Sequence, residues 1–273
     1  YHVQPCDDQQ WGEKMNIFVL MKRTFDTEEK IIVENNRISK DGVEWVINPY
    51  DEYAIEEGIK LREEFGGEVT VACIGPSEAE KELRTALAMG ADKAILVEVD
   101  EDELQGDEHT TAQLLASLLK DRPFDIILAG NVSVDNGAGQ VAPRVAELLD
   151  IPQVTTITHL TVDADQNKAT VERDVEGDVE IVQISLPALF TAQQGLNEPR
   201  YPSLPGIMKA KKKPLESIQL GDLKLEQQDL AAKTEVVEVF LPPEKKAGRI
   251  LEGELEDQVK ELAHLLHSEA KVI

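Results

Sequence analysis

Glycines gather at one point of the chain, between a short apolar run and a helix-like pattern. The stretch "AGNVSVDNGAGQ" places Gly130, Gly137 and Gly139 after "FDIILAG" and before "VAPRVAELL". Glycine lets a backbone approach an anion closely, and the first N–H groups of a helix favour a phosphate. The stretch is neither G-x-G-x-x-G nor a Walker A sequence. It is typical either of a phosphate-binding loop or of a simple turn, and the residues leave both open.

A second segment, "GLNEPRYPSLPGIMKAKKKP", differs in charge from the rest of the chain. Its four lysines, Lys209 and Lys211 to Lys213, fall within five positions of a chain whose formal net charge is −25. Three prolines and the apolar residues Leu204, Ile207 and Met208 precede or interleave with them. These residues by themselves do not assign the segment a role.

Residue patterns that carry catalysis are missing from the sequence. There is no G-x-S-x-G elbow and no His-x-x-x-His, and the five histidines are scattered. Cys6 and Cys73 have no metal-ligand spacing, which predicts a reducing compartment without a disulfide framework. We therefore expect no catalytic residue and no metal site, and nucleotide binding and partner contact become the leading roles.

The elements that must position the glycine-rich loop alternate along the chain. Apolar runs "MNIFVLMK", "EVTVACIGP", "KAILVEV" and "FDIILAG" are separated by amphipathic stretches. This alternation predicts an α/β fold with a doubly wound, mainly parallel sheet. Asn48 is expected to cap one helix, and Ser77 with Glu80 is spaced as a capping box for the next. Ligands of such sheets bind where strands end, which here selects the loops "MKRT", "CIGPSE" and "AGNVSVDNGAGQ".

The chain changes character after about residue 151. β-Branched residues alternate through "VTTITHLTVDADQNKATVERDVEGDVEIVQISLPALFTA", which predicts an antiparallel extension of about three strands at the sheet edge. A further strand is expected at "TEVVEVFLPP" and a helix from about Leu251. The apolar positions Leu255, Val259, Leu262 and Leu265 of that helix fit either the core or an arm packed on a partner.

The charge and the apolar runs of the chain argue against nucleic acids and membranes as its partners. A pI near 4.5 argues against nucleic acid, because phosphates repel an anionic surface. No apolar run has the length of a membrane span, so we expect no membrane insertion. Residues 1–14 lack periodicity and the apolar core of a signal peptide, and are expected to be a disordered leader or extension.

The residues also carry a family likeness. "LNEPRYPSLPGIMKAKKKP" closely resembles the signature of the electron transfer flavoprotein β subunit, and the likeness extends through "VLMKRTFD", "INPYDEYAIEEGIKLRE", "GPSEAEKELRTALAMGADKAILVE" and "VERDVEG". It covers about residues 15–222. The resemblance implies an adenine-nucleotide alpha-hydrolase-like domain over 15–222 and a C-terminal arm over 223–273 that packs on the α subunit.

The resemblance also implies cofactors. In that family the α subunit holds most of the redox FAD, and the β subunit buries a structural AMP. Bifurcating relatives carry a second FAD in place of AMP. The glycine-rich loop of this chain fully matches neither the mitochondrial-type nor the bifurcating sequences. The AMP-contacting positions of the family correspond to Leu20, Asn48, Pro49, Tyr50, Asp51, Ile74, Gly130, Asn131, Val132, Ser133, Val134, Asp135, Asn136, Gly137, Ala138, Gly139, Gln140 and Val141.

The lysine-bearing segment matches the partner-recognition loop of the family, over residues 192–214. An apolar anchor in a proline-restricted loop loses little conformational entropy on docking, and lysines steer an acidic partner. The alternative is that Leu204 and Ile207 pack on their own domain. The corresponding recognition positions are Leu204, Pro205, Ile207, Met208, Lys209, Lys211 and Lys212.

The function implied is that of an electron carrier rather than an enzyme. It would take electrons from acyl-CoA-type and related flavin dehydrogenases, in fatty acid oxidation, and pass them to electron transfer flavoprotein–quinone oxidoreductase. A bacterial-type chain would work in the cytoplasm, and a eukaryotic one in the mitochondrial matrix. The alternatives are an electron-bifurcating complex and a solitary adenine-nucleotide-binding regulatory protein, which would leave the lysine-bearing segment unexplained.

Overall fold

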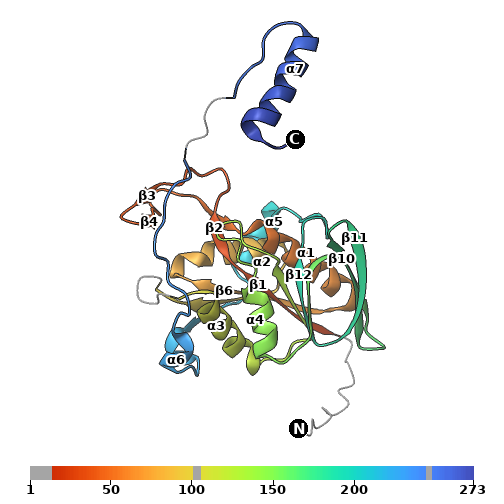
Figure 1. Ribbon diagram of the computed structural model, residues 1–273. Helices are drawn as coiled ribbons and strands as arrows, with labels where there is room; N and C mark the ends of the chain where they lie inside the picture. The colour runs from red at the N-terminus through yellow and green to blue at the C-terminus, as the bar shows by residue number, and fades with distance from the viewer. Residues whose placement is uncertain (1–13, 101–105, 244–247) are drawn as a thin grey trace. The chain divides into compact units, whose positions relative to one another are not determined.

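The computed structural model describes residues 14–100, 106–243 and 248–273 (Figure 1). Its chain divides into two compact units. The first holds the described residues up to Lys30 together with Lys40–Val237, and the second holds Ile31–Ser39 and the described part of Glu238–Ile273. The leader predicted at residues 1–14 lies, but for Lys14, outside the described residues, as does Cys6.

A nine-stranded sheet forms the centre of the first unit, in the order β11-β10-β9-β12-β8-β1-β6-β7-β13. Its parallel strands are β1 (Met15–Met21), β6 (Gly67–Gly75), β7 (Lys93–Glu98), β8 (Ile126–Gly130), β12 (Ala188–Ala192) and β13 (Leu215–Gln219). The central strands are apolar throughout because helices cover both faces. The predicted doubly wound, mainly parallel α/β fold is confirmed.

Two helices cover each face of the sheet (Figure 1). On one face α1 (Pro49–Phe65) and α2 (Glu80–Met89) pack against β1 and β6; on the other, α3 (Glu108–Lys120) and α4 (Val141–Leu148) lie side by side. After β7 the chain crosses through α3 to β8, on the opposite side of β1. The order of strands therefore reverses between β1 and β8, where sheets of this kind bind ligands.

The predicted antiparallel extension consists of β9 (Gln153–Asp163), β10 (Lys168–Val175) and β11 (Asp178–Ser185). The prediction was wrong for the last strand of the stretch. β12 runs parallel to both β8 and β9 and lies between them. Its apolar residues are all buried, as expected of a strand inside a sheet rather than at its edge.

Several local predictions are corrected. Ser77 and Glu80 form no capping box, because Ser77 lies in a 3₁₀ turn (Ser77–Ala79) and its hydroxyl donates to Glu78 Oε2. No strand forms at "TEVVEVFLPP", where the backbone at 234–243 pairs with no strand of the described chain. Strand propensity without a hydrogen-bonded neighbour is insufficient. Conversely β13 was missed, since it is an edge strand with only Ile218 fully buried.

The smaller elements are β2 (Arg23–Phe25) paired with β5 (Trp45–Ile47), α5 (Leu204–Ala210), the 3₁₀ turn Leu220–Asp222 and α6 (Gln227–Leu230). The second unit contains the hairpin β3 (Val33–Glu34) and β4 (Arg37–Ile38), then α7 (Leu255–Leu265) and a π turn (Leu266–Ala270). Within the described chain, no helix is both long and apolar enough to span a bilayer.

The apolar stripe of α7 is not buried within the second unit. The helix begins at Leu255 rather than near Leu251, and the unit leaves Leu255, Val259 and Leu262 exposed. Both alternatives for the stripe, the core of the chain and an arm packed on a partner, stay predictions.

Candidate functional site

A buried carboxylate joins the two strands at which the sheet order reverses. Asp51, on the first turn of α1, accepts hydrogen bonds from the backbone N–H of Lys22 (2.7 Å to Oδ2) and of Gly130 (2.9 Å to Oδ1). Burial raises the pKa of Asp51 to about 7, against the opposing effect of these hydrogen bonds and of Asn48. A side chain at Gly130 would overlap the Asp51 carboxylate and Tyr50, so only glycine fits.

Asn48 holds the glycine-rich loop from the other side. Its Nδ2 donates to the Val132 carbonyl at 2.9 Å, and its Oδ1 accepts from Val134 N–H at 3.1 Å. Asn48 occupies the N-cap position of α1, but its side chain does not cap that helix; its carbonyl accepts from Asp51 N–H at 2.8 Å. The buried side-chain amide of Asn48 therefore holds the glycine-rich loop and does not cap α1.

The far side of the loop is held by Lys22. Its ammonium lies 2.7 Å from Asp135 Oδ2 and donates to Ser133 Oγ at 3.3 Å. The hydrogen bond and charge of Lys22 lower the pKa of Asp135, although desolvation opposes them. The Asn136 amide oxygen accepts from Ser133 Oγ and from Ala138 N–H, closing a turn inside the loop.

The loop leads directly into the first turn of α4. Gly137 and Gly139 have φ of 64° and 60°, a conformation that favours glycine. In the part of the chain described, no side chain caps α4; the amide oxygen of Gln140 accepts from Arg144 instead. Helix-start N–H groups without a side-chain cap can donate hydrogen bonds to an anion, and the helix dipole favours binding of the anion there.

The structure brings most of the predicted nucleotide positions together. Asn48 to Asp51 and Gly130 to Val141 meet at the reversal point, and with Lys22 they form what we call the strand-end cradle. Leu20 lies near the carboxyl end of β1 and Ile74 near the carboxyl end of β6. Both side chains belong to the apolar layer under α3 and α4. Lys22 was not among the residues matched to AMP, although it lies in the strand-end loop "MKRT" that its place directly after β1 had selected.

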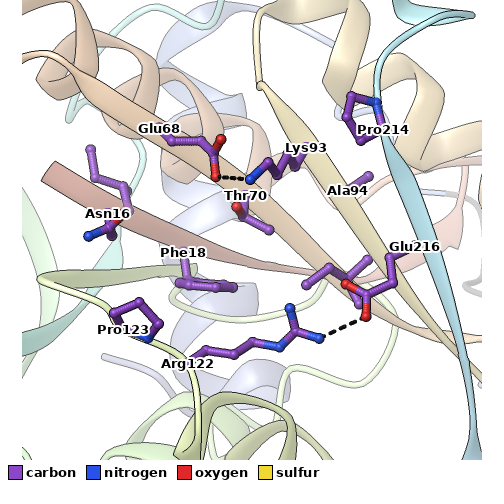
Figure 2. Close-up of a pocket in the computed structure, with 12 residues that line it drawn as sticks. Asn16, Phe18, Glu68, Thr70, Lys93, Ala94, Arg122, Pro123, Pro214 and Glu216 are labelled. Atoms are coloured by element: carbon purple, nitrogen blue, oxygen red, sulfur yellow. Dashed lines mark hydrogen bonds and ion pairs between the residues drawn. The ribbon is translucent and has the colours of Figure 1, made fainter. Parts of the chain in front are cut away.

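Two cavities lie elsewhere in the first unit. One, of about 460 Å³, opens at the amino ends of β1, β6 and β7, and its charged side chains pair with each other: Lys93 with Glu68 at 2.7 Å and Arg122 with Glu216 at 3.0 Å (Figure 2). The other, of about 740 Å³, is lined by the carboxylates of Glu78, Glu98 and Asp100. Neither offers an unpaired cation to a phosphate.

The lysine-bearing segment presents apolar side chains to the outside. We call residues 201–212 the docking segment; it contains α5, whose N-cap Ser203 accepts from Gly206 N–H at 3.1 Å. Leu204 is 80% exposed and Met208 73%, and Ile207 is also exposed. In this structure Leu204 thus does not pack on its own domain.

Lys213 stands apart from the other lysines. Its ammonium donates to the carbonyls of Ala91 at 2.6 Å and Leu87 at 3.0 Å, and burial lowers its pKa. Unlike the exposed Lys209, Lys211 and Lys212, Lys213 is half-buried and its ammonium is engaged by backbone carbonyls.

Among the described residues, no group of three His, Cys, Asp or Glu is arranged to hold a metal ion. Cys73 is a free, buried thiol whose pKa burial raises to about 12. A thiol in that state is a poor nucleophile.

Comparison with known proteins agrees with these features. A model of the electron transfer flavoprotein domain matches residues 36–223. The chain is 61% identical over 259 residues to an electron transfer flavoprotein subunit beta of Bacillus subtilis (strain 168), covering 95% of this chain and 100% of the relative. It is 40% identical over 259 residues to that of Syntrophomonas wolfei subsp. wolfei (94% and 98% covered).

The likeness extends to animals. An electron transfer flavoprotein subunit beta of Homo sapiens is 39% identical over 256 residues, covering 92% of this chain and 98% of the relative. The family model spans both the strand-end cradle from Asn48 onward and the docking segment. The chain therefore belongs to the electron transfer flavoprotein family, as a β-type subunit that functions in electron transfer.

Proposed function

We propose that this chain is the β subunit of a heterodimeric electron transfer flavoprotein, binding AMP in the strand-end cradle. The observation that carries the proposal is the fixing of one glycine-rich loop from three sides, by Asn48, Asp51 and Lys22, at the point where the strand order reverses. A simple turn would not need three side chains from outside the loop to hold it. Pre-ordering a loop lowers the entropy that ligand binding must overcome.

The chemistry of the cradle suits one phosphate and one purine. The start of α4 supplies N–H groups for the phosphate, and the apolar layer that contains Leu20 and Ile74 suits a flat base. Gly130 keeps the backbone close to Asp51 and leaves no side chain in the way. This role is structural, because the cradle contains no group that could exchange electrons.

The redox group in this proposal is FAD, held mainly by the α subunit and completed by this chain. Acyl-CoA-type and related flavin dehydrogenases dock on Leu204 and its neighbours and deliver electrons, which leave toward a quinone reductase. The subunit itself is a carrier and catalyses no net reaction. One relative is bacterial, and the relative from Arabidopsis thaliana is named mitochondrial. In this proposal the chain therefore works in the cytoplasm if it is bacterial, or in the mitochondrial matrix if it is eukaryotic.

Nucleotide content of the purified heterodimer tests this assignment. The chain is co-expressed with its α subunit, the complex is denatured, and released AMP and FAD are counted by mass and flavin absorbance. One AMP and one FAD per heterodimer are expected. Two FAD and no AMP would replace the carrier with the bifurcating alternative, and a chain that binds neither nucleotide nor an α subunit would overturn the proposal.

A further inference from the structure

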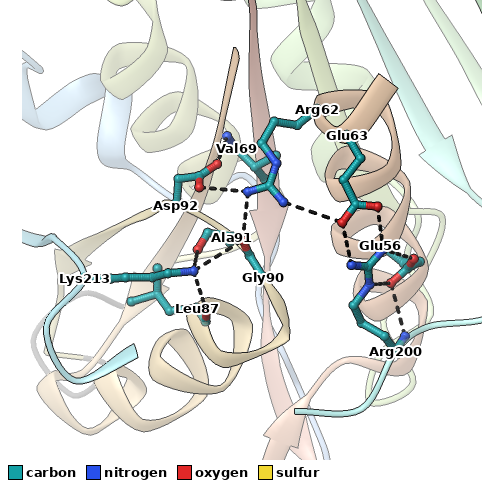
Figure 3. Close-up of polar contacts among 10 residues, drawn as sticks. All are labelled: Glu56, Arg62, Glu63, Val69, Leu87, Gly90, Ala91, Asp92, Arg200 and Lys213. Atoms are coloured by element: carbon teal, nitrogen blue, oxygen red, sulfur yellow. Dashed lines mark hydrogen bonds and ion pairs between the residues drawn. The ribbon is translucent and has the colours of Figure 1, made fainter. Parts of the chain in front are cut away.

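The amino-terminal end of the docking segment is fixed on α1 by one arginine. The Arg200 guanidinium donates to both oxygens of Glu56, each at 2.8 Å, and to Glu63 Oε1 at 2.8 Å (Figure 3). Its backbone N–H donates to Glu56 Oε2 as well, at 3.1 Å. Glu56 is only 5% exposed, so this fork of charge-assisted hydrogen bonds has a buried side.

The carboxyl-terminal end is fixed on α2 by a lysine. Lys213 donates to the carbonyls of Leu87, Gly90 and Ala91, where α2 ends and its carbonyl groups lack helical partners (Figure 3). From α2, Arg84 donates back to the carbonyls of Ala210 and Lys213, both at 2.9 Å. The two ends of the docking segment thus rest on two neighbouring helices.

Between these ends α5 rests on α2 through small residues. α5 has seven residues, too few for a stable isolated helix, and of them only Ala210 is buried. A side chain at Gly206 would overlap the Ala88 carbonyl of α2, so the two helices approach closely there. Leu204 and Met208 project away from the first unit's core. The order of α5 must therefore come from this contact with α2 together with the attachments at its two ends.

We propose that Arg200 and Lys213 are positioning residues: they clamp the docking segment at both ends, so that Leu204 and Met208 are presented in one place. The proposal rests on the proposed docking function of this segment. A segment released from the clamp samples many conformations, and binding is weakened by the fraction of molecules in the competent one. Docking affinity should fall while bound AMP is unaffected, because neither residue belongs to the strand-end cradle.

The test uses the complete heterodimer carrying Arg200→Lys, Arg200→Gln or Lys213→Met. Arg200→Lys keeps the charge but cannot form the fork to Glu56 and Glu63. KM for the heterodimer as electron acceptor of an acyl-CoA dehydrogenase is measured together with kcat. Amide hydrogen exchange of residues 203–210 is measured without the dehydrogenase. We expect KM to rise about tenfold in Arg200→Gln, by a smaller factor in Arg200→Lys, with kcat unchanged and exchange faster in both.

Two further variants keep the test decisive. Lys93→Gln removes a surface ion pair at the amino end of β7 and should change neither KM nor exchange. Glu63 is half exposed, so Glu63→Gln weakens only one arm of the clamp and serves if Arg200→Gln does not assemble. In it, KM and exchange should rise less than in Arg200→Gln.

The outcomes separate the clamp from the docking function. Unchanged KM and exchange in the Arg200 and Lys213 variants, while Leu204→Ala raises KM, would overturn the clamp and leave docking intact. A raised KM with unchanged exchange would also overturn it, since Arg200 would then touch the partner directly. If Leu204→Ala has no effect, docking itself is wrong, whereas faster exchange in the variants would still support the clamp.

Discussion

Leu204 combines high exposure with a fixed position, which is unusual for a leucine outside an interface. It is the first residue of α5, directly after the N-cap Ser203, and 80% of its surface is open to solvent. An apolar side chain that fills a pocket on a partner stabilises the complex through desolvation. Nothing in the first unit uses this side chain for folding.

Leu204→Ala should therefore weaken docking without altering the fold. We expect the affinity for an acyl-CoA dehydrogenase to fall by about 1 kcal/mol or more, roughly fivefold, with the flavin spectrum and the thermal midpoint unchanged. Steady-state electron transfer at varied heterodimer concentration measures it. Leu148→Ala on α4, another exposed leucine, is the matched control. Equal rates for the Leu204 variant and the wild type would contradict the anchor assignment.

Asp51 makes the stability of the chain depend on pH in a direction opposite to that of most carboxylates. Burial raises its pKa from the ordinary 3.8 to about 7, so the folded chain holds this proton more tightly than the unfolded one. The stabilisation linked to this proton is complete below pH of about 4 and is lost as the pH rises through about 7, amounting to about 4 kcal/mol.

Asp51→Asn removes this titration and isolates its contribution. The difference in thermal midpoint, wild type minus variant, should fall steadily as the pH increases from 5 to about 7 and level off between about 7 and 8.5. Other titrating groups are common to both proteins and cancel in the difference. Parallel curves for the two proteins across this range would show that the Asp51 carboxyl does not titrate there.

At the scale of elements, the sequence predicts the helices and strands that have regular apolar periodicity. It does not predict strands whose formation depends on pairing with residues far away along the chain. The apolar strands and amphipathic helices of residues 15–151 follow directly from periodicity. The β13 strand was not predicted, because an edge strand with few buried residues has a weak pattern. "TEVVEVFLPP" has a strong strand pattern but no neighbour to pair with.

The candidate site divides in the same way. The glycine-rich loop and its place after β8 were predictable from glycine spacing. The role of Asp51 was not, because the Gly130 N–H that it binds is 79 positions away along the chain. In the sequence, Lys213 likewise cannot be distinguished from a surface lysine. In the structure its ammonium donates to three carbonyl groups at the end of α2.

The loop between β8 and α4 provides a prediction at this scale. Asn48→Ala removes both hydrogen bonds that the amide makes to the backbone of Val132 and Val134. Each contributes about 0.5–1.5 kcal/mol, so the affinity for AMP should fall roughly tenfold. AMP retained per heterodimer after gel filtration measures it, with FAD content as an internal reference.

A control distinguishes loss of the loop from general damage. Gln219→Ala removes an amide that donates to Glu98 at the carboxyl end of β7, away from the strand-end cradle. It should retain AMP and FAD in equal amounts. Full AMP retention in Asn48→Ala would mean that the loop does not hold the nucleotide.

At the scale of the whole molecule, charge and exposed apolar surface are unevenly distributed. The chain has a formal net charge of −25, yet the docking segment carries Lys209, Lys211 and Lys212 beside its apolar residues. A local positive patch on an anionic protein favours encounter with an acidic partner surface at that place alone. The second unit has exposed apolar residues on α7 instead, a helix whose single lysine is Lys260.

This difference suggests that the second unit meets another partner. We propose that its C-terminal part, within 238–273, belongs to the C-terminal arm predicted at 223–273 and that the stripe of Leu255, Val259 and Leu262 packs on the α subunit. The three residues recur at helical spacing and lie exposed on α7. The described part of the second unit does not bury them, and an amphipathic helix of this kind is stabilised by a partner's apolar surface.

Introducing a charge into the stripe tests the arm. Val259→Asp and Leu262→Asp should weaken association with the α subunit at least tenfold, because a carboxylate would be buried at the interface without a counter-charge. Lys260→Asp, on the charged side of the same helix where Lys260 pairs with Glu256, places the same group beside the stripe and should leave association within about threefold of wild type. Heterodimer dissociation constants from sedimentation, at one ionic strength for all variants, give the comparison. If the stripe and control variants dissociate alike, α7 does not cover the α subunit and its apolar face needs another explanation.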